Sequence, residues 1–212
     1  MKPRAGWPEG YERRVLTTVD STNAEAARRA AELSGPEWIL ALEQTEARGR
    51  RGRAWASPPG NFAATLVMRP TESLDRVALR SFVAALALFD ALVAATGRAT
   101  GLALKWPNDV LLNGGKLAGI LLESAGSTGS LSHFAIGIGV NLRNAPDADE
   151  VEPGAARPVS LLSETGIAIA PEPFLDLLAP AYAQHEAQFV IYGFAPIRAA
   201  WLARAAKLGE TI

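Results

Sequence analysis

The sequence predicts an α+β fold in which helices pack on one face of a mixed, mainly antiparallel sheet. Residues 102–140 contain short apolar segments joined by tight turns, which is typical of successive antiparallel strands. Longer segments with apolar residues at helical spacing lie on either side of this stretch, within 74–95 and 173–208. The 212 residues, 49% hydrophobic and 20% charged, suit a single domain over residues 1–212.

The first half of the chain is expected to alternate helices and strands. Thr22-Asn23-Ala24-Glu25 has the pattern of a capping box, so a helix is expected from there to Leu33. Gly35-Pro36 then ends that helix. The other expected elements are strands at 38–44 and 62–68 and a long amphipathic helix at 74–95.

The second half is expected to form a meander of hairpins followed by helices. Asn113-Gly114-Gly115 is a hairpin signal. The polar, acidic and Pro-rich segment 144–158 is expected to be a mobile surface loop. The expected strands are 102–106, 110–112, 116–123 and 134–140, with a turn at 126–130, and the expected helices are 160–164, one starting near Pro173, and about 196–208.

Charge and composition narrow the functional classes. A net charge of −1 disfavours a nucleic acid partner, because phosphate neutralisation needs a basic excess. With no cysteine, the sequence offers no disulfide, thiolate metal site or cysteine nucleophile, and its two histidines lack ligand spacing. The start of the chain has no apolar signal segment, and the apolar run 82–95 contains Asp90 and is too short to span a bilayer. We therefore expect a cytoplasmic protein without a membrane partner.

Two motifs concentrate cations in short segments. Residues 47–55 read Ala-Arg-Gly-Arg-Arg-Gly-Arg-Ala-Trp, and such arginines are suited to clamping phosphate or carboxylate groups. Residues 105–109 read Lys-Trp-Pro-Asn-Asp, and residues 115–121 read Gly-Lys-Leu-Ala-Gly-Ile-Leu. Taken alone, the first motif fits an RNA-binding Arg/Gly tract or a solvated basic turn as well as it fits a loop that binds a small anion. The two motifs together indicate a site for a small anion.

These motifs, together with Asp-Ser-Thr-Asn at 20–23 and Gly-Ile-Gly-Val-Asn at 137–141, resemble the catalytic domain of the biotin protein ligases. The resemblance implies a fold like that of class II aminoacyl-tRNA synthetases. It also implies that ATP with Mg²⁺ activates biotin to biotinoyl-AMP, and that biotin then passes to a lysine of a biotin carboxyl carrier protein. Two alternatives are a lipoate or octanoate ligase of the same fold and an RNA-binding module that uses the arginine loop. A homodimer is possible.

The resemblance also assigns site residues. Lys116, Arg50 and Lys105 are the catalytic candidates, because they place cations where phosphate charge accumulates. Asp109 is a possible ligand of the Mg²⁺ that accompanies ATP. The residues expected to bind biotin are Ser21, Thr22, Asn23, Gln44, Arg48, Gly49, Arg50, Lys116, Gly119 and Gly137. The residues expected to bind the nucleotide are Arg50, Arg53, Trp55, Lys105, Asn108, Asp109, Lys116 and Asn141.

The resemblance sets two further expectations about domains. Nineteen residues precede the first motif, which is too short for the N-terminal DNA-binding domain of some family members. The small C-terminal β-barrel of the family is expected to be absent, because the sequence ends soon after the last predicted helix. One departure from the family pattern is Ala47, which stands where glycine is frequent.

Overall fold

A seven-stranded sheet forms the centre of the protein. The structure, a computed structural model, describes residues 6–55, 57–127, 130–147 and 156–206. The strand order is β1-β2-β3-β7-β6-β5-β4. β1 and β2 run parallel and the remaining neighbours are antiparallel, which confirms a mixed, mainly antiparallel sheet. The strands are β1 Glu12–Val19, β2 Glu37–Gln44, β3 Phe62–Met68, β4 Leu102–Lys105, β5 Asp109–Leu112, β6 Gly115–Ser127 and β7 Ser130–Val140.

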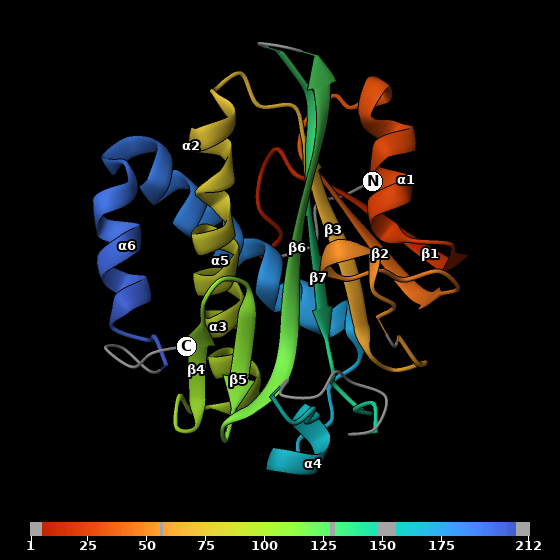
Figure 1. Ribbon diagram of the computed structural model, residues 1–212, viewed down its shortest axis with the longest axis vertical. Helices are drawn as coiled ribbons and strands as arrows, with labels where there is room; N and C mark the ends of the chain where they lie inside the picture. Colours follow the sequence, from red (N-terminus) through yellow and green to blue (C-terminus); the bar gives the residue numbers. More distant parts are fainter. Residues whose placement is uncertain (1–5, 56, 128–129, 148–155, 207–212) are drawn as a thin grey trace.

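The long helices cover one face of this sheet, as expected (Figure 1). The helices of this layer are α2 Leu74–Ala78, α3 Arg80–Thr96, α5 Pro171–Tyr192 and α6 Phe194–Leu202. The short helix α1, Thr22–Arg29, continues into a 3₁₀ turn at Ala30–Glu32 and packs on the opposite face, against β2, β3 and β7. The short helix α4, Leu161–Thr165, comes between β7 and α5 in the sequence. The sheet therefore has helices on both faces, but the long helices all lie on one face and the short helix α1 lies on the other.

Successive side chains of a strand point to opposite faces of the sheet, and the large apolar ones face the long helices. Phe62 of β3 contacts Phe174 of α5 edge-to-face, with ring centroids 5.0 Å apart. Trp38 of β2 meets Tyr182 in the same way at 5.9 Å. Burial of this apolar layer supplies the main stabilisation, at about 25 cal/mol per Å². On the α1 face a separate, smaller cluster of buried apolar residues contains Ala26, Ile39, Val67 and Ala135.

Several element boundaries differ from the sequence prediction. β1 was not predicted, because an edge strand that reads Glu-Arg-Arg-Val-Leu-Thr-Thr-Val lacks a continuous apolar side. The helix expected over 74–95 is divided at Leu79 into α2 and α3. α6 ends at Leu202 within the described residues. Parts of the expected 126–130 turn and 144–158 loop lie outside the described residues.

The segment Leu74–Thr96 is long and apolar enough to cross a bilayer by length and composition alone. Most of it is buried inside the protein, where α3 packs against α5 and the sheet. This is the behaviour of a core helix.

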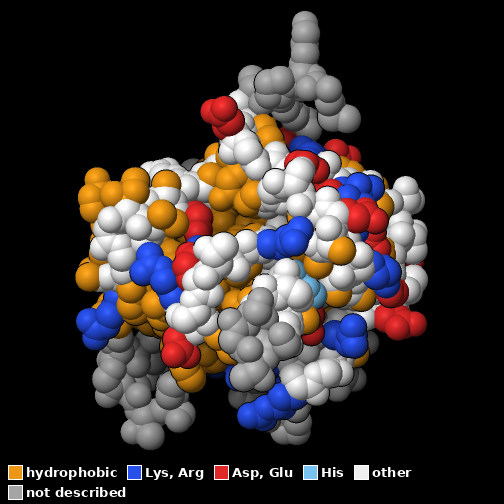
Figure 2. All heavy atoms as spheres, turned by 90° about the horizontal axis from the view of Figure 1, so that it is seen from above, with side chains coloured by type: hydrophobic (Ala, Val, Ile, Leu, Met, Phe, Trp, Pro, Cys, Tyr) orange, Lys and Arg blue, Asp and Glu red, His pale blue; other side chains and the backbone are white. Residues whose placement is uncertain are grey.

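Figure 2 shows hydrophobic side chains gathered at the edge of the molecule on the side of α5 and α6. Val190, Ile191 and Tyr192, at the end of α5, are more than half exposed. The residues that the motifs assign to a site belong to other elements.

Candidate active site

A row of small residues crosses the α1 face of the sheet. Strand register places Asp109 of β5 opposite Gly119 of β6, and Gly119 opposite Gly139 of β7. Gly139 in turn pairs with Ala63 of β3, and Ala63 with Ala41 of β2. The residues of such a row point to the same face of the sheet. Because four of them are glycine or alanine, little side-chain volume stands above the sheet along the row. We call these five residues the small-residue row.

Trp55 lies against the glycines of this row. A Cβ added to Gly139 would lie 2.7 Å from Cε2 and Nε1 of the indole, and one added to Gly119 would lie 3.3 Å from Cζ3. These distances show that the indole contacts the sheet where side chains are missing. Trp55 was predicted to lie near the nucleotide, whereas no role was predicted for Gly139. The Gly-x-Gly spacing in β7 was the signal for that residue.

A β-bulge turns Lys116 towards the same face. The register shifts between Val110 and Leu111, so that Val110 pairs with Ala118 and Leu111 with Lys116. Regular alternation would put residues 116 and 119 on opposite faces, and the extra residue corrects this. Leu117 takes the core side instead and is fully buried. The Lys116 side chain consequently lies near Gly119, with Cε 3.8 Å from the position of an added Cβ.

The Lys116 ammonium has two partners at this end of the row. Its Nζ lies 2.8 Å from Oδ1 of Asp109 and 5.6 Å from the centre of the Trp55 ring. Lys105 is the cross-strand partner of Asp109, so both side chains lie on one face. Two of the three catalytic candidates therefore flank one carboxylate. Within the described residues no group of three or more His, Cys, Asp or Glu side chains could hold a metal ion.

The arginine motif forms a closed loop that reaches the second motif. The amide of Gly49 donates to the carbonyl of Arg53 at 2.7 Å, and the amide of Trp55 donates to the carbonyl of Ala47 at 3.0 Å. Nη1 of Arg50 donates to Oδ1 of Asn108 at 3.3 Å. Asn108 is itself fixed, because its Nδ2 donates to the Ile120 carbonyl at 2.8 Å. The structure thus brings the two motifs together, while Arg48 and Arg53 are exposed on the loop.

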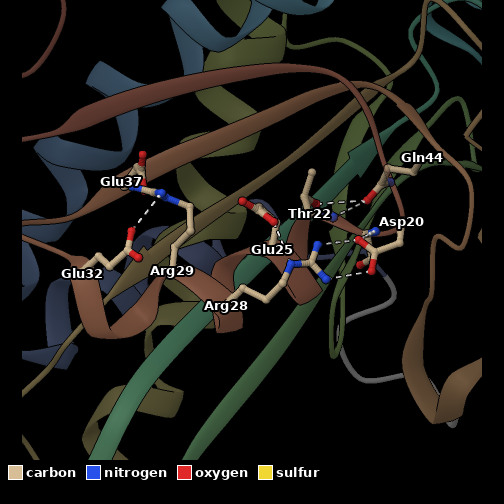
Figure 3. Close-up of polar contacts among 9 residues, drawn as sticks. Asp20, Thr22, Glu25, Arg28, Arg29, Glu32, Glu37 and Gln44 are labelled. Atoms are coloured by element: carbon tan, nitrogen blue, oxygen red, sulfur yellow. Dashed lines mark hydrogen bonds and ion pairs between the residues drawn. The ribbon is translucent and has the colours of Figure 1, made fainter.

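The expected capping box at 22–25 is wrong. Ser21 is the N-cap of α1 and its side chain makes no cap hydrogen bond. The backbone N–H and the hydroxyl of Thr22 instead donate to Oε1 of Gln44, at 2.8 and 3.1 Å (Figure 3). Glu25 accepts from Arg28 rather than closing a box. The Thr22 hydroxyl does not cap the helix because it donates to Gln44, a contact made by tertiary structure.

Asp20 and Arg28 hold the start of α1 in place. The Arg28 guanidinium donates to both carboxylate oxygens of Asp20, at 2.7 and 2.8 Å (Figure 3). The Ser21 N–H donates to Asp20 Oδ1 at 2.7 Å. The Arg28 hydrogen bonds, with that of Ser21, keep the pKa of the Asp20 carboxyl well below its ordinary value. Asp20 belongs to the motif at 20–23, but no role was predicted for it.

Asn23 connects α1 to the middle of the sheet. Its Oδ1 lies 2.6 Å from the hydroxyl of Thr65, and its Nδ2 donates to Oε2 of Glu123 at 2.7 Å. A Cβ added to Gly137 would lie 2.4 Å from Asn23 Oδ1. Gly137 was expected to leave room for a ligand, and in this structure the room is taken by Asn23. Thr65 and Glu123 were missed, although a threonine within the apolar run 62–68 was a signal.

Asn141 is buried at the end of β7. Its Nδ2 donates to the carbonyl of Val159 at 3.1 Å, and within the described residues its Oδ1 has no hydrogen-bond partner. The amide of Val159 in turn donates to the carbonyl of Lys116 at 3.0 Å. Asn141 therefore supports the backbone beside Lys116, and its role towards a nucleotide stays a prediction.

Comparison of the chain with known proteins identifies its relatives. Residues 15–141 match the biotin/lipoate A/B protein ligase family. The biotin–[acetyl-CoA-carboxylase] ligase of Paracoccus denitrificans is 64% identical over 198 residues, which cover 93% of this chain and 82% of that protein. The bifunctional ligase/repressor BirA of Bacillus spizizenii is 31% identical over 203 residues, and the match spans 61% of its length.

A solved structure shows the same fold. The biotin protein ligase from Aquifex aeolicus in complex with biotin and ATP superposes with a TM-score of 0.80 at 26% identity, covering 94% of this chain and 80% of that one. These relatives confirm the resemblance inferred from the motifs.

Proposed function

Because the chain belongs to the biotin/lipoate A/B protein ligase family, we propose that it activates biotin with ATP and transfers it to a lysine of a biotin carboxyl carrier protein. The observation that carries the proposal is the position of Lys116 at the cationic end of the small-residue row, 2.8 Å from Asp109 and against Trp55. The proposed compartment is the cytoplasm.

The two ends of the site match the two ends of biotin. Thr22, Asn23 and Gln44 place hydrogen-bonding groups at one end, which suits the polar ureido ring. The glycines of the row give an apolar surface for the ring and chain. Lys116 and Arg50 place cations at the other end, which suits the carboxylate and the phosphates. This polarity supports biotin over a ligand without a ureido group.

The proposed chemistry has two steps. The biotin carboxylate attacks the α-phosphorus of ATP and pyrophosphate leaves, which forms biotinoyl-AMP. The acceptor lysine amine then attacks the acyl carbon, AMP leaves, and the amine loses a proton. The Lys116 ammonium stabilises the negative charge that develops on the phosphate oxygens, and Arg50 holds the loop near Asn108. No covalent bond to the enzyme is needed.

Asp109 is the carboxylate that the described part of this site offers to a divalent cation. It is a single carboxylate already paired with Lys116, so Mg²⁺ would be held mainly by the ATP phosphates, whose charge it neutralises. We propose that Asp109 contributes at most one ligand.

Pyrophosphate exchange tests the proposal against its alternatives. The protein should catalyse biotin-dependent exchange of labelled pyrophosphate into ATP, and it should label a carrier domain with biotin. Exchange supported by lipoate and not by biotin would favour a lipoate ligase instead. The named relatives above 30% identity are biotin ligases, and none of the comparisons supports an RNA-binding module.

A further inference from the structure

The backbone of Lys116 is bonded to a segment that is distant in the sequence. β7, which pairs with β6 along most of its length, ends at Val140. Beyond that point residues 157–159 lie beside the start of β6 and run parallel to it. The Lys116 N–H donates to the Arg157 carbonyl at 2.7 Å, and the Val159 N–H donates to the Lys116 carbonyl at 3.0 Å. We call residues 157–159 the strap.

Two residues allow the strap to approach β6 closely. A Cβ added to Gly115 would clash with Cγ1 of Val159 and would lie 2.9 Å from the Arg157 carbonyl oxygen, so the strap needs a glycine there. Pro158 is the bridge partner of Lys116. In a parallel bridge of this pattern the nitrogen of the partner residue faces away from the strand, so no hydrogen bond to β6 is lost by having proline at this position.

The strap supports β6 at the β-bulge. The pairing between β5 and β6 skips Leu117, whose carbonyl accepts from the Asn141 N–H at 2.9 Å instead. A slip of one residue into regular pairing would turn Lys116 to the opposite face of the sheet, away from Asp109. The two hydrogen bonds of the strap are made by the backbone of Lys116 itself, so they oppose such a slip.

Glu164 of α4 joins the strap to the turn that precedes Lys116. Its Oε2 accepts from Nδ2 of Asn113 at 2.8 Å, and its Oε1 accepts from Nη2 of Arg157 at 3.1 Å. The hydrogen bonds from Asn113 and from Arg157 lower the pKa of Glu164, so its carboxyl is ionised and acts only as an acceptor. Because Asn113 and Arg157 are exposed, these bonds contribute little to global stability.

We propose that Glu164 is a positioning residue that fixes Lys116 in the site. One of its oxygens holds the strap, which bonds the backbone of Lys116. The other holds the turn between β5 and β6, the two strands that carry Asp109 and Lys116. Glu164 therefore acts on the lysine through the backbone on both sides of it. The inference rests on the proposed function, in which the position of the Lys116 ammonium determines the rate of adenylation.

The test exchanges hydrogen-bonding groups between Glu164 and Asn113, and it measures single-turnover formation of biotinoyl-AMP from labelled biotin and ATP with Mg²⁺. Glu164→Gln offers one acceptor to two donors, so one bond is lost. The rate should fall about 10-fold, between the effect of one hydrogen bond and that of a displacement of about 1 Å. Asn113→Asp places two carboxylates together and should lower the rate at least as far.

The double variant Asn113→Asp/Glu164→Gln should restore the rate to within about 2-fold of the wild type. In this variant the glutamine donates to the aspartate and still accepts from Arg157. Aspartate suits the turn, because Asp-Gly is favoured in hairpins as Asn-Gly is. Recovery by the second substitution identifies the hydrogen bond between the two side chains as the cause of both single effects.

A Lys116→Ala background separates positioning from damage to the fold. Glu164→Gln should leave the residual adenylation rate of this variant unchanged, because the side chain to be positioned is missing. Damage to the fold would lower that rate as well. Glu172→Gln is the matched control, because Glu172 of α5 accepts from Arg13 at 2.9 Å in another partly exposed ion pair, and its adenylation rate should equal that of the wild type.

The outcomes distinguish this inference from the proposed function. A wild type without biotin-dependent pyrophosphate exchange overturns both. If the wild type catalyses exchange, a normal adenylation rate in Glu164→Gln overturns the role of Glu164 alone. So does a double variant at least as slow as the slower single variant, or an effect of Glu164→Gln that is equally large with and without the Lys116 side chain.

Discussion

Trp55 contacts Gly139 so closely that one added carbon on the glycine would lie 2.7 Å from two atoms of the indole ring. Real Cβ contacts are essentially never this short, and a ring held on a loop cannot yield as the end of a flexible side chain does. The same indole contacts Gly119 and lies 5.6 Å from the Lys116 ammonium. The position of the aromatic ring beside the catalytic candidate Lys116 thus depends on a missing side chain on the neighbouring strand.

The first prediction is that Gly139→Ala displaces Trp55 and weakens ATP use by the enzyme. The strand itself should remain stable, because alanine is no worse than glycine in a strand interior. Exchange assays with varied ATP should show a raised KM in this variant, with little change in the melting temperature. In a Trp55→Ala background the added methyl group has nothing to displace, so it should have little further effect. Additive effects of the two substitutions would contradict the contact as the cause.

The second prediction concerns Lys116. Lys116→Ala should lower the rate of biotinoyl-AMP formation by roughly 10²–10³-fold, the scale for removing one preorganised electrostatic contact. The variant should still fold, because the Lys116 side chain is partly exposed and its ion pair with Asp109 lies in the site and not in the hydrophobic core. Single-turnover adenylation and thermal unfolding measure the two effects separately. Arg98→Ala, which removes a cation from an exposed turn, is the control. Near-normal adenylation by Lys116→Ala would refute the assignment.

Most elements of the fold were predictable where the sequence carries a local pattern. The strand Phe62–Met68 was predicted to the residue, because a run that is apolar except for Thr65 lies between a Pro-Gly turn and Arg69-Pro70. β1 was missed, because its stability comes from pairing with β2 at the edge of the sheet. Pairing of that kind leaves no periodic signal in a polar segment.

The candidate site was predictable only as far as the motifs extend. Lys116 and Asn108 were assigned by resemblance, and the structure places them near Asp109 and Arg50. The bulge that turns Lys116 towards the row, and the contacts of Thr65 and Glu123, depend on strand register. Register joins residues that are far apart in the sequence, so no local pattern reveals it.

The third prediction uses the lowered pKa of Asp20. A carboxyl whose pKa is lower in the folded state contributes stability that is fully present above its ordinary value, 3.8, and is lost as the pH falls towards the lowered value. Replacing Asp20 by asparagine should therefore destabilise the protein by a constant amount at pH 7 to about 5. The difference from the wild type should shrink as the pH falls below that range.

Denaturant unfolding at a series of pH values measures this difference. Asp75→Asn is the control, because Asp75 is exposed at the start of α2. Biotin affinity of Asp20→Asn should also fall at neutral pH, since Asp20 fixes the amide of Ser21 and the guanidinium of Arg28. A destabilisation that is the same at pH 3 and pH 7 would rule out the ion pair as its source.

The fourth prediction separates two neighbouring arginines of the loop. Arg50 contacts Asn108, so Arg50→Gly should loosen the loop over biotinoyl-AMP and shorten the time for which the intermediate is retained. Arg51 has a positive φ of 60°, a conformation that glycine adopts without strain. Arg51→Gly removes the same charge from an exposed position while relieving the backbone, and it should retain the intermediate as the wild type does.

Rapid dilution of enzyme loaded with labelled biotinoyl-AMP, followed by filtration, measures the release rate for both variants. Release from Arg50→Gly should be at least several-fold faster, and the freed intermediate should label lysines of bystander proteins without selectivity. Adenylation itself should suffer less, because Lys116 and Asp109 are unchanged. Equal acceleration in both variants would mean that the charge of the loop retains the intermediate, and that the contact between Arg50 and Asn108 does not.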